Sequence, residues 1–268
     1  AVRPSLKNLK REPMKLYLIR HGESANNVIF SSTGDKSGRV PDPELTERGH
    51  QQAELLASLL ADPQGEPHHH PHESRAPGNG NGSHAMGFGL THVYCSLMSR
   101  SILTAQYIAK ACGLPLMAHA DIFEKNGIYE INPDGTNTGL PGRDQTYFTE
   151  RFPELELPEN LNQDGWYNRP FETETQFLER SKQVALDFIT AHTDSDDSVA
   201  MVIHGDLIDQ LVNELTGTVR HAENYENHWV ANWAFHNTSI TRIDVAAGSR
   251  VIVYTNRLQH LSPEMITW

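Results

Sequence analysis

Three short apolar runs constrain the fold of this chain more strongly than any other feature. Residues 14–20 (MKLYLIR), 91–96 (THVYCS) and 198–204 (SVAMVIH) contain neither glycine nor proline. Each run has the length of a strand, and stretches with helical spacing lie between them. Alternation of buried strands with helices is typical of a parallel sheet that carries helices on both faces. We therefore expect an α/β fold, a three-layer sandwich with a mostly parallel central sheet and an inserted cap.

The stretches between these runs carry apolar residues at helical spacing. The predicted helices span residues 46–61, 99–113, 172–192 and 206–216. Thr46 is suited to cap the start of the first helix, and Gly113 is suited to end the second. Two strand-like runs at 238–245 and 250–256 are joined by Ala-Ala-Gly-Ser, which predicts a hairpin.

Two segments interrupt this regular alternation. Residues 62–89 are rich in Gly, Pro, His and Asn and show no periodicity, which predicts a flexible surface insertion. The histidines at 68–72 have metal-ligand chemistry, but such loops usually lack the fixed geometry of a metal site. Residues 120–171 mix Gly, Pro and Asn with arginines and aromatics, and we interpret them as a cap over a substrate pocket. The whole chain, 1–268, is expected to form one domain.

The overall charge of the chain limits its partners. The formal net charge is −12, so DNA, RNA and anionic membranes are not expected as partners. No window approaches the roughly 18 apolar residues of a membrane span, and the basic first residues lack the apolar core of a secretory signal. We expect a cytoplasmic protein in which Cys95 and Cys112 stay reduced.

Polar residues with a common chemistry stand at the ends of the three apolar runs. They are Arg20, His21, Ser96, Arg100 and His204, of which Arg100 belongs to the helix after the second run. Because ligands bind at the carboxyl ends of parallel strands, we expect these side chains to converge on one point.

Two arginines and two histidines at one point suit a phosphoryl group. The planar fork of arginine makes paired, charge-assisted hydrogen bonds to phosphate oxygens. A neutral imidazole can attack phosphorus when a hydrogen bond to its other nitrogen fixes the tautomer. Phosphoryl transfer is catalysed mainly by positioning and charge stabilisation, which this set supplies. The residues therefore predict phosphoryl transfer without a metal and without another cofactor.

The same residues resemble the signature of the histidine phosphatase superfamily, which includes the cofactor-dependent phosphoglycerate mutases. The similar motifs are LIRHGES at 18–24 with Asn27, LTERG at 45–49 with Gln52 and Ala53, Ser96 to Arg100 with Thr104 and Ala105, and VIHG at 202–205. The resemblance spans residues 16 to about 245, interrupted by the insertion at 62–89. It implies the same α/β fold.

The resemblance also implies roles for individual residues. His21 would be phosphorylated, and the phosphoryl group would be held by Arg20, Asn27, Arg100, His204 and Gly205. A carboxylic acid would protonate the leaving oxygen.

Two carboxylates compete for that role of acid. FEKNG at 123–127 resembles the L-x-E-x-x-x-G stretch of most relatives, one residue short, and this points to Glu124. In another branch an Asp directly follows the second histidine, and here Asp206 follows one residue later, which makes it the reserve candidate. If Glu124 were instead paired with Arg100, its pKa would fall and it would be a poor acid.

The resemblance leaves the reaction type to be decided between relatives. The mutases carry a longer Asn-Glu-Arg-His-Tyr-Gly type segment and extra basic residues for a second phosphate, whereas this chain has FEKNGIYE and mixes its cap arginines with acidic residues. We therefore expect hydrolysis of a small phosphorylated substrate, a phosphomonoester. The alternatives are a phosphoglycerate mutase-type phosphotransferase, a catalytically idle protein that binds a phosphorylated ligand, and a metal-dependent phosphatase that uses the His-rich loop.

Overall fold

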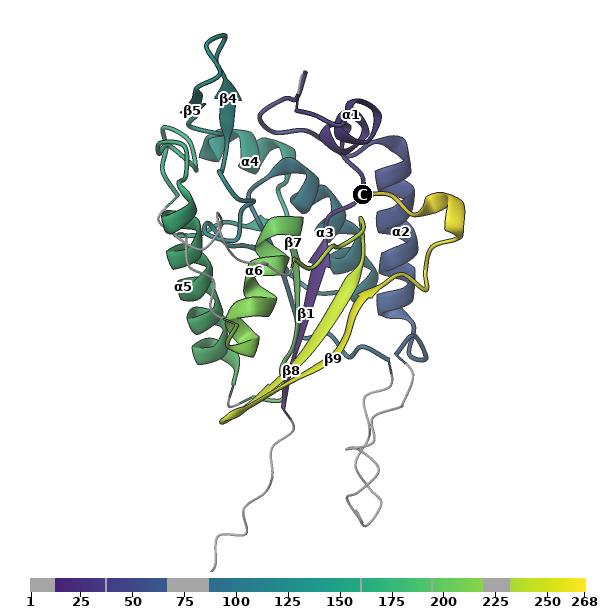
Figure 1. Cartoon of the computed structure of the whole chain (residues 1–268). Helices are drawn as coiled ribbons and strands as arrows, with labels where there is room; N and C mark the ends of the chain where they lie inside the picture. The colour runs from purple at the N-terminus through teal and green to yellow at the C-terminus, as the bar shows by residue number, and fades with distance from the viewer. Residues whose placement is uncertain (1–12, 37, 67–86, 160, 194, 219–231) are drawn as a thin grey trace, which may run out of the picture.

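A seven-stranded sheet forms the centre of the computed structural model (Figure 1). The structure describes residues 13–36, 38–66, 87–159, 161–193, 195–218 and 232–268. In sheet order the strands are β6 (Leu155–Glu156), β3 (Leu116–Ala118), β2 (His92–Cys95), β7 (Ser198–Ile203), β1 (Met14–Arg20), β8 (Ile240–Ala246) and β9 (Ser249–Arg257).

The three predicted apolar strands lie side by side in the middle of this sheet. Strands β2, β7 and β1 pair in parallel, with Met201 opposite both Tyr94 and Leu18. Every residue of β7 is buried, as expected of a strand covered on both faces. The predicted hairpin is also present, because β8 pairs antiparallel with β9 and with β1. The sheet is therefore mostly parallel, which confirms the predicted fold class.

Helices cover both faces of the sheet. In chain order the α-helices are α1 (Ala25–Thr33), α2 (Glu47–Ala61), α3 (Ser99–Cys112), α4 (Gln145–Arg151), α5 (Glu174–His192) and α6 (Gly205–Thr216). Helices α2 and α3 pack on one face, and α5 and α6 pack on the other (Figure 1). The predicted caps are in place: the Gly49 amide donates to Thr46 Oγ1 over 3.0 Å, and Gly113 ends α3 with a φ of 65°.

Alternation along β1 divides the apolar residues between two cores. Tyr17 and Ile19 belong to the core under α2 and α3, whereas Leu16 and Leu18 belong to the core under α5 and α6. Successive side chains of a strand point to opposite faces, and burial of each large apolar side chain contributes about 1.5–3 kcal/mol. Packing in the two cores fixes the position of β1 in the sheet. It thereby also fixes the position of Arg20 and His21 at the carboxyl end of this strand.

Helix α1 is a difference from the sequence prediction. No residue of α1 is buried, so its sequence has no apolar periodicity from which to predict it. The helix instead begins with a capping box, in which the Ser24 amide donates to Asn27 Oδ1 over 2.9 Å.

The segment at 120–171 contains more regular structure than its sequence indicates. Strands β4 (Tyr129–Ile131) and β5 (Asn137–Gly139) form a separate small sheet, and β6 extends the edge of the main sheet beside β3. These elements are too short for periodicity to reveal. The interpretation of this segment as a cap stays a prediction, as does the single domain.

The described residues bear on the predictions for the insertion, for the two cysteines and for membrane spans. Most of the insertion predicted at 62–89, namely 67–86, lies outside them. Cys95 is buried and Cys112 half-buried, and both carry free thiols. No helix in the described ranges is long and apolar enough to cross a membrane.

Candidate active site

The structure brings the predicted residues together at the carboxyl edge of the sheet. His21 follows β1, Ser96 follows β2 and His204 follows β7. The rings of His21 and His204 have centroids 5.2 Å apart. Arg100 stands in the first turn of α3, and its Nε donates to His21 Nε2 over 3.0 Å. The predicted convergence of these side chains is therefore present.

His21 is held in the tautomer that a nucleophile requires. Its Nδ1 lies 2.7 Å from the carbonyl oxygen of Gly22, to which only a protonated nitrogen can donate. Its Nε2 accepts from Arg100 and so carries a lone pair. Burial, followed by the positive charges of Arg100 and Arg20, lowers the pKa of His21 well below its usual value. The side chain is therefore a neutral imidazole with Nε2 free of a proton.

His204 is fixed with the opposite arrangement of nitrogens. Its Nε2 lies 2.7 Å from Ser96 Oγ, which in turn accepts from the Met98 amide over 3.3 Å. Among the described residues the Ser96 hydroxyl has no acceptor other than Nε2, so it donates there and the proton of the neutral ring stands on Nδ1. Burial and the charge of Arg100 lower the pKa of His204 well below its usual value. Its Nδ1 is buried without a hydrogen-bond partner among the described residues.

Arg20 presents a second unpaired donor. Its Nη1 donates to the Phe235 carbonyl over 2.5 Å, whereas its Nε is buried and meets no acceptor in the part of the chain that is described. Burial lowers the pKa of Arg20 to about 10, so the side chain stays charged at neutral pH. A buried donor left unpaired costs about 1–3 kcal/mol. An anion that accepts from Arg20 Nε and His204 Nδ1 would remove that cost.

The carboxyl group of Glu124 lies close enough to Arg20 and Arg100 for their charges to affect its pKa. Burial raises the pKa of Glu124 to about 7, with the Asp206 carboxylate adding to this effect and Arg100 and Arg20 opposing it. Its Oε1 accepts from the Lys125 amide over 2.9 Å. The arginines do not outweigh the burial, so pairing with Arg100 does not make Glu124 a weak proton donor. At neutral pH the carboxyl group is divided between its protonated and ionised forms.

A buried ion pair fixes the loop that carries Glu124. Arg180 of α5 donates through Nε and Nη2 to the two carboxylate oxygens of Glu172, over 2.6 and 2.8 Å. Its Nη1 donates to the carbonyls of Asp121 and Phe123, immediately before Glu124. Both side chains of the pair are less than a tenth exposed. The sequence offers no signal for this pair, which depends on α5 packing against the loop.

The remaining predicted residues lie near the site in different roles. Asn27 Oδ1 accepts from the backbone amide and the hydroxyl of Ser24, so it stabilises the start of α1. Gly205 is close to Arg20, because a Cβ on it would lie 3.6 Å from Arg20 Nε. Asp206 is exposed in the first turn of α6 and acts on Glu124 and Arg20 through its charge.

Three residues hold the backbone around His21; Asn237 and Thr267 were not predicted, and Gln52 was named only as part of a motif. The Asn237 side chain donates to the His21 carbonyl over 3.0 Å, and its own Oδ1 accepts from Thr267 Oγ1 over 3.0 Å. Gln52 joins the same network by accepting from the Glu23 amide and donating to Thr267. The backbone after β1 is therefore clamped by residues near the end of the sequence.

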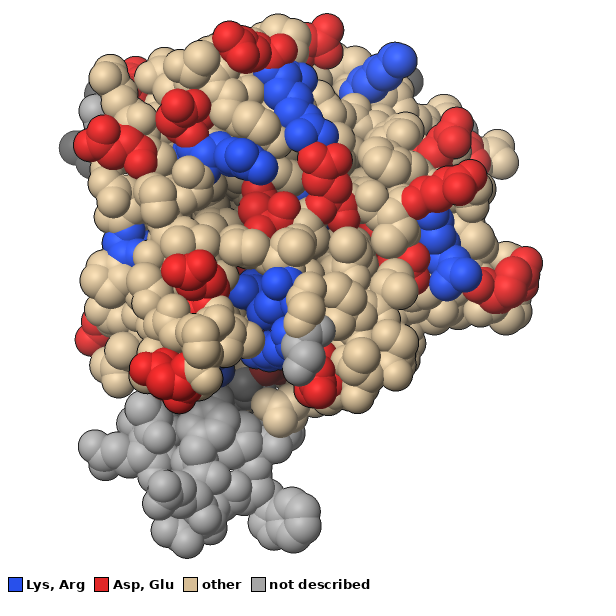
Figure 2. Space-filling view, turned by 90° about the horizontal axis from the view of Figure 1, so that it is seen from above, with Lys and Arg blue, Asp and Glu red and all other residues tan. Residues whose placement is uncertain are grey.

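The surface above this edge carries basic and acidic side chains interspersed, as Figure 2 shows from above. Both a buried and an exposed arginine are accompanied by carboxylates: Arg100 Nη1 lies 4.0 Å from Asp42 Oδ1, and the exposed Arg151 pairs with Glu44 over 2.6 Å. The site therefore attracts an anion through a few buried donors rather than through a broad positive field.

With this geometry established, comparison with known sequences identifies the family. The sequence model of the histidine phosphatase superfamily (branch 1) matches residues 16–76 and 81–257. The chain therefore belongs to the histidine phosphatase superfamily, as its motifs predicted.

Curated relatives match a smaller part of the chain. A stretch of 121 residues is 29% identical to the probable phosphoglycerate mutase GpmB of Yersinia pestis (strain Pestoides F), covering 45% of this chain and 42% of that protein. The protein of the same name from Yersinia pseudotuberculosis serotype O:1b (strain IP 31758) gives the same values. The matched stretch thus spans less than half the length of these relatives.

Solved structures share the fold at low sequence identity. A phosphoserine phosphatase from Entamoeba histolytica, in complex with 3-phosphoglyceric acid, has a TM-score of 0.52 at 20% identity over 93% of this chain and 100% of that one. A putative alpha-ribazole-5'-P phosphatase from Escherichia coli has a TM-score of 0.55 at 18% identity, over 91% and 97%. At these identities the likeness concerns the fold.

Proposed function

We propose that this chain is a phosphomonoester hydrolase that works through a phosphohistidine on His21. The observation that carries the proposal is the pair of unpaired buried donors, Arg20 Nε and His204 Nδ1, beside a neutral imidazole. Buried donors that stay unsatisfied in the resting protein, on residues next to the nucleophile, suit an anion whose charge is spread over several oxygens.

In the first step His21 Nε2 attacks phosphorus. A bond forms between this nitrogen and phosphorus while the bond from phosphorus to the ester oxygen breaks. Arg100 Nε, which occupies the Nε2 lone pair in the resting site, transfers its hydrogen bond to a phosphoryl oxygen. The ester oxygen takes the proton of Glu124, whose pKa of about 7 leaves a substantial protonated fraction at neutral pH.

In the second step Glu124 acts in the reverse direction. As a carboxylate it takes a proton from a water molecule, whose oxygen attacks phosphorus. The bond between phosphorus and Nε2 breaks, inorganic phosphate leaves, and His21 regains its neutral form. Arg20, Arg100 and His204 Nδ1 hold the phosphoryl oxygens in both steps, so the residues of the chain supply the charge stabilisation without a metal.

The contacts of the cap arginines favour hydrolysis over transfer to a second substrate. A mutase must hold a second phosphate as well as the reacting one. Here Arg151 is paired with Glu44 over 2.6 Å, and Arg169 is paired with Asp121 over 3.4 Å. The names of the solved neighbours, phosphatases of small phosphorylated molecules, agree with a small phosphomonoester as substrate.

The test is hydrolysis of a panel of small phosphomonoesters in the presence of a chelator, with wild type beside His21→Ala. We expect turnover by the wild type, none by the variant, and acid-labile label on the wild type after brief exposure to ³²P-labelled substrate. The mechanism is contradicted if His21→Ala keeps full activity, or if chelator abolishes the activity of the wild type. Absence of turnover together with transfer between phosphoglycerates would identify a mutase, and tight binding alone would identify an idle relative.

A further inference from the structure

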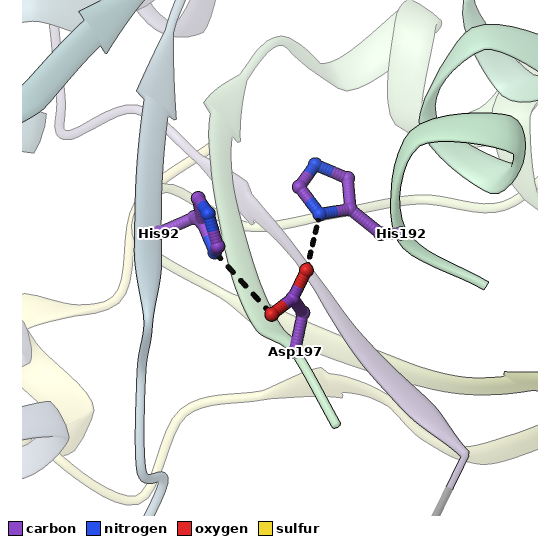
Figure 3. A group of neighbouring side chains, drawn as sticks. All are labelled: His92, His192 and Asp197. Atoms are coloured by element: carbon purple, nitrogen blue, oxygen red, sulfur yellow. Dashed lines mark hydrogen bonds and ion pairs between the residues drawn. The ribbon is translucent and has the colours of Figure 1, made fainter. Parts of the chain in front are cut away.

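A second group of histidines lies at the opposite, amino edge of the sheet. It consists of His92 at the start of β2, His192 in the last turn of α5, and Asp197 immediately before β7 (Figure 3). One nitrogen from each histidine and one carboxylate oxygen lie within 4.8 Å of one another. Figure 3 shows both rings directed at the carboxylate. We propose that these three residues form a binding site for a divalent transition-metal ion, with Zn²⁺ as the fitting ion.

The chemistry of the three ligands selects the class of ion. Imidazole nitrogens suit Zn²⁺, Ni²⁺ and Cu²⁺, whereas Mg²⁺ and Ca²⁺ prefer oxygen ligands. Two histidines and one carboxylate give three protein ligands, which leaves the fourth tetrahedral position to water. At the carboxyl edge, by contrast, the buried guanidinium groups of Arg20 and Arg100 would repel a cation.

Binding of an ion requires the three ligand atoms, which lie within 4.8 Å of one another, to rearrange slightly. His192 Nδ1 lies 2.7 Å from Asp197 Oδ2, and His92 Nδ1 lies 4.0 Å from Asp197 Oδ1. Ligand atoms about 2 Å from a tetrahedral Zn²⁺ stand about 3.3 Å apart. The His92 side chain is 31% exposed and that of Asp197 is 23% exposed, so both can adjust and an ion can reach them.

The surroundings of the cluster hold two of the ligands in place. The Asp197 carbonyl accepts from the Lys15 amide over 2.8 Å, which ties the residue to β1. His192 is 6% exposed, and its Nε2 lies 3.4 Å from the Tyr94 hydroxyl. A histidine that binds a metal through one nitrogen commonly donates a hydrogen bond through the other. Tyr94 supplies that acceptor once the proton of His192 moves from Nδ1 to Nε2, which leaves Nδ1 free to bind the ion.

The five histidines at 68, 69, 70, 72 and 84 could also bind Zn²⁺ and would obscure the measurement. The experiment therefore uses the full chain with these five changed to glutamine as the background. Equilibrium dialysis with metal analysis gives the Zn²⁺ stoichiometry, and calorimetry gives the affinity. We expect one tightly bound Zn²⁺ in this background and a higher Tm when Zn²⁺ is present.

Three variants of this background test the assignment. His192→Ala and Asp197→Asn should each weaken Zn²⁺ binding about 100-fold or more, because each removes a ligand. His50→Ala, which removes a histidine of α2 that contacts Tyr107, should bind Zn²⁺ like the background. Asp197→Asn keeps an acceptor for His192 and should melt like the background without metal, which separates lost binding from lost folding.

The proposal is overturned if the background binds no Zn²⁺, or if Asp197→Asn and His192→Ala bind it unchanged. Loss of the ion on His204→Ala instead would place it at the carboxyl edge and also contradicts the proposal.

Discussion

The two edges of the sheet use histidines in opposite electrostatic settings. At the carboxyl edge, His21 and His204 are buried beside Arg20 and Arg100, and these neighbours add to the effect of burial in lowering their pKa values. At the amino edge, His92 and His192 share the carboxylate of Asp197. The same side chain therefore prepares one edge for an anion and the other for a cation, and the neighbours decide which.

The largest expected effect is on kcat, and it distinguishes the carboxyl edge of the sheet from the amino edge. His21→Ala should lower kcat by about 10⁴-fold or more, because it removes the nitrogen to which phosphorus is proposed to bond. His192→Ala, assayed in chelator, is the matched substitution at the amino edge and should leave kcat within about twofold. The check is steady-state hydrolysis of one substrate by both variants, and equal losses would show that the two edges are not independent.

Replacement of the acid should depend on the leaving group. Glu124→Gln should lower kcat about 10²–10³-fold on alkyl phosphates and much less on p-nitrophenyl phosphate, whose leaving oxygen needs no proton. The ratio of the two losses is the measurement. If Asp206→Asn shows this ratio and Glu124→Gln does not, the proton comes from Asp206.

The pH dependence follows from the raised pKa of Glu124. The proton donor is lost as pH rises through about 7, so formation of the phosphohistidine should fall tenfold per unit above that value. Single-turnover measurements between pH 6 and 9 provide the check. The descending limb should disappear in Glu124→Gln, and its persistence there would assign it to another group.

Disruption of the ion pair between Arg180 and Glu172 should lower kcat less than replacement of Glu124 does. Arg180→Lys keeps the charge but cannot donate at once to Glu172 and to the carbonyls of the Glu124 loop, so we expect kcat to fall about tenfold with little change in KM. A shift in the descending limb of the pH profile would show that the loop has moved. An unchanged profile with a lower Tm alone would reduce the pair to a structural role.

The smallest expected effect is on stability. The folded pKa of Glu124 is raised above that of the unfolded chain, so ionisation destabilises the fold as pH rises between about 4.5 and 7, and the cost persists above 7. Glu124→Gln should therefore increase the free energy of unfolding at pH 8 by roughly 1–2 kcal/mol, and by less at pH 5. Chemical denaturation at both pH values tests the sign of this change in the free energy of unfolding. The sign would be reversed if Arg20 and Arg100 stabilised the Glu124 carboxylate.

The sequence predicts those parts of the molecule that rest on local periodicity. Strands β1, β2 and β7 are apolar and uninterrupted, so their existence and the convergence of His21 and His204 could be predicted. Helix α1 has no buried face, and the strands of the 120–171 segment are two or three residues long, so neither leaves a periodic signal.

The parts of the site that could not be predicted depend on contacts between distant segments. Asn237 reaches the His21 carbonyl, and Arg180 reaches the loop before Glu124, only because the strands and α5 are packed. The pKa of Glu124 likewise depends on how deeply the loop is buried and on its distance from Asp206. No spacing in the sequence records either quantity.

The clamp on His21 has a consequence for the order in which the protein becomes active. Asn237, which donates to the His21 carbonyl, follows it by 216 positions, and Thr267 lies 30 positions further on, so both are synthesised well after His21. Domains begin to fold while the ribosome is still adding residues, but contacts between distant segments form last. A growing chain therefore contains β1, β2 and β7 before it contains the residues that hold the backbone of His21 in place.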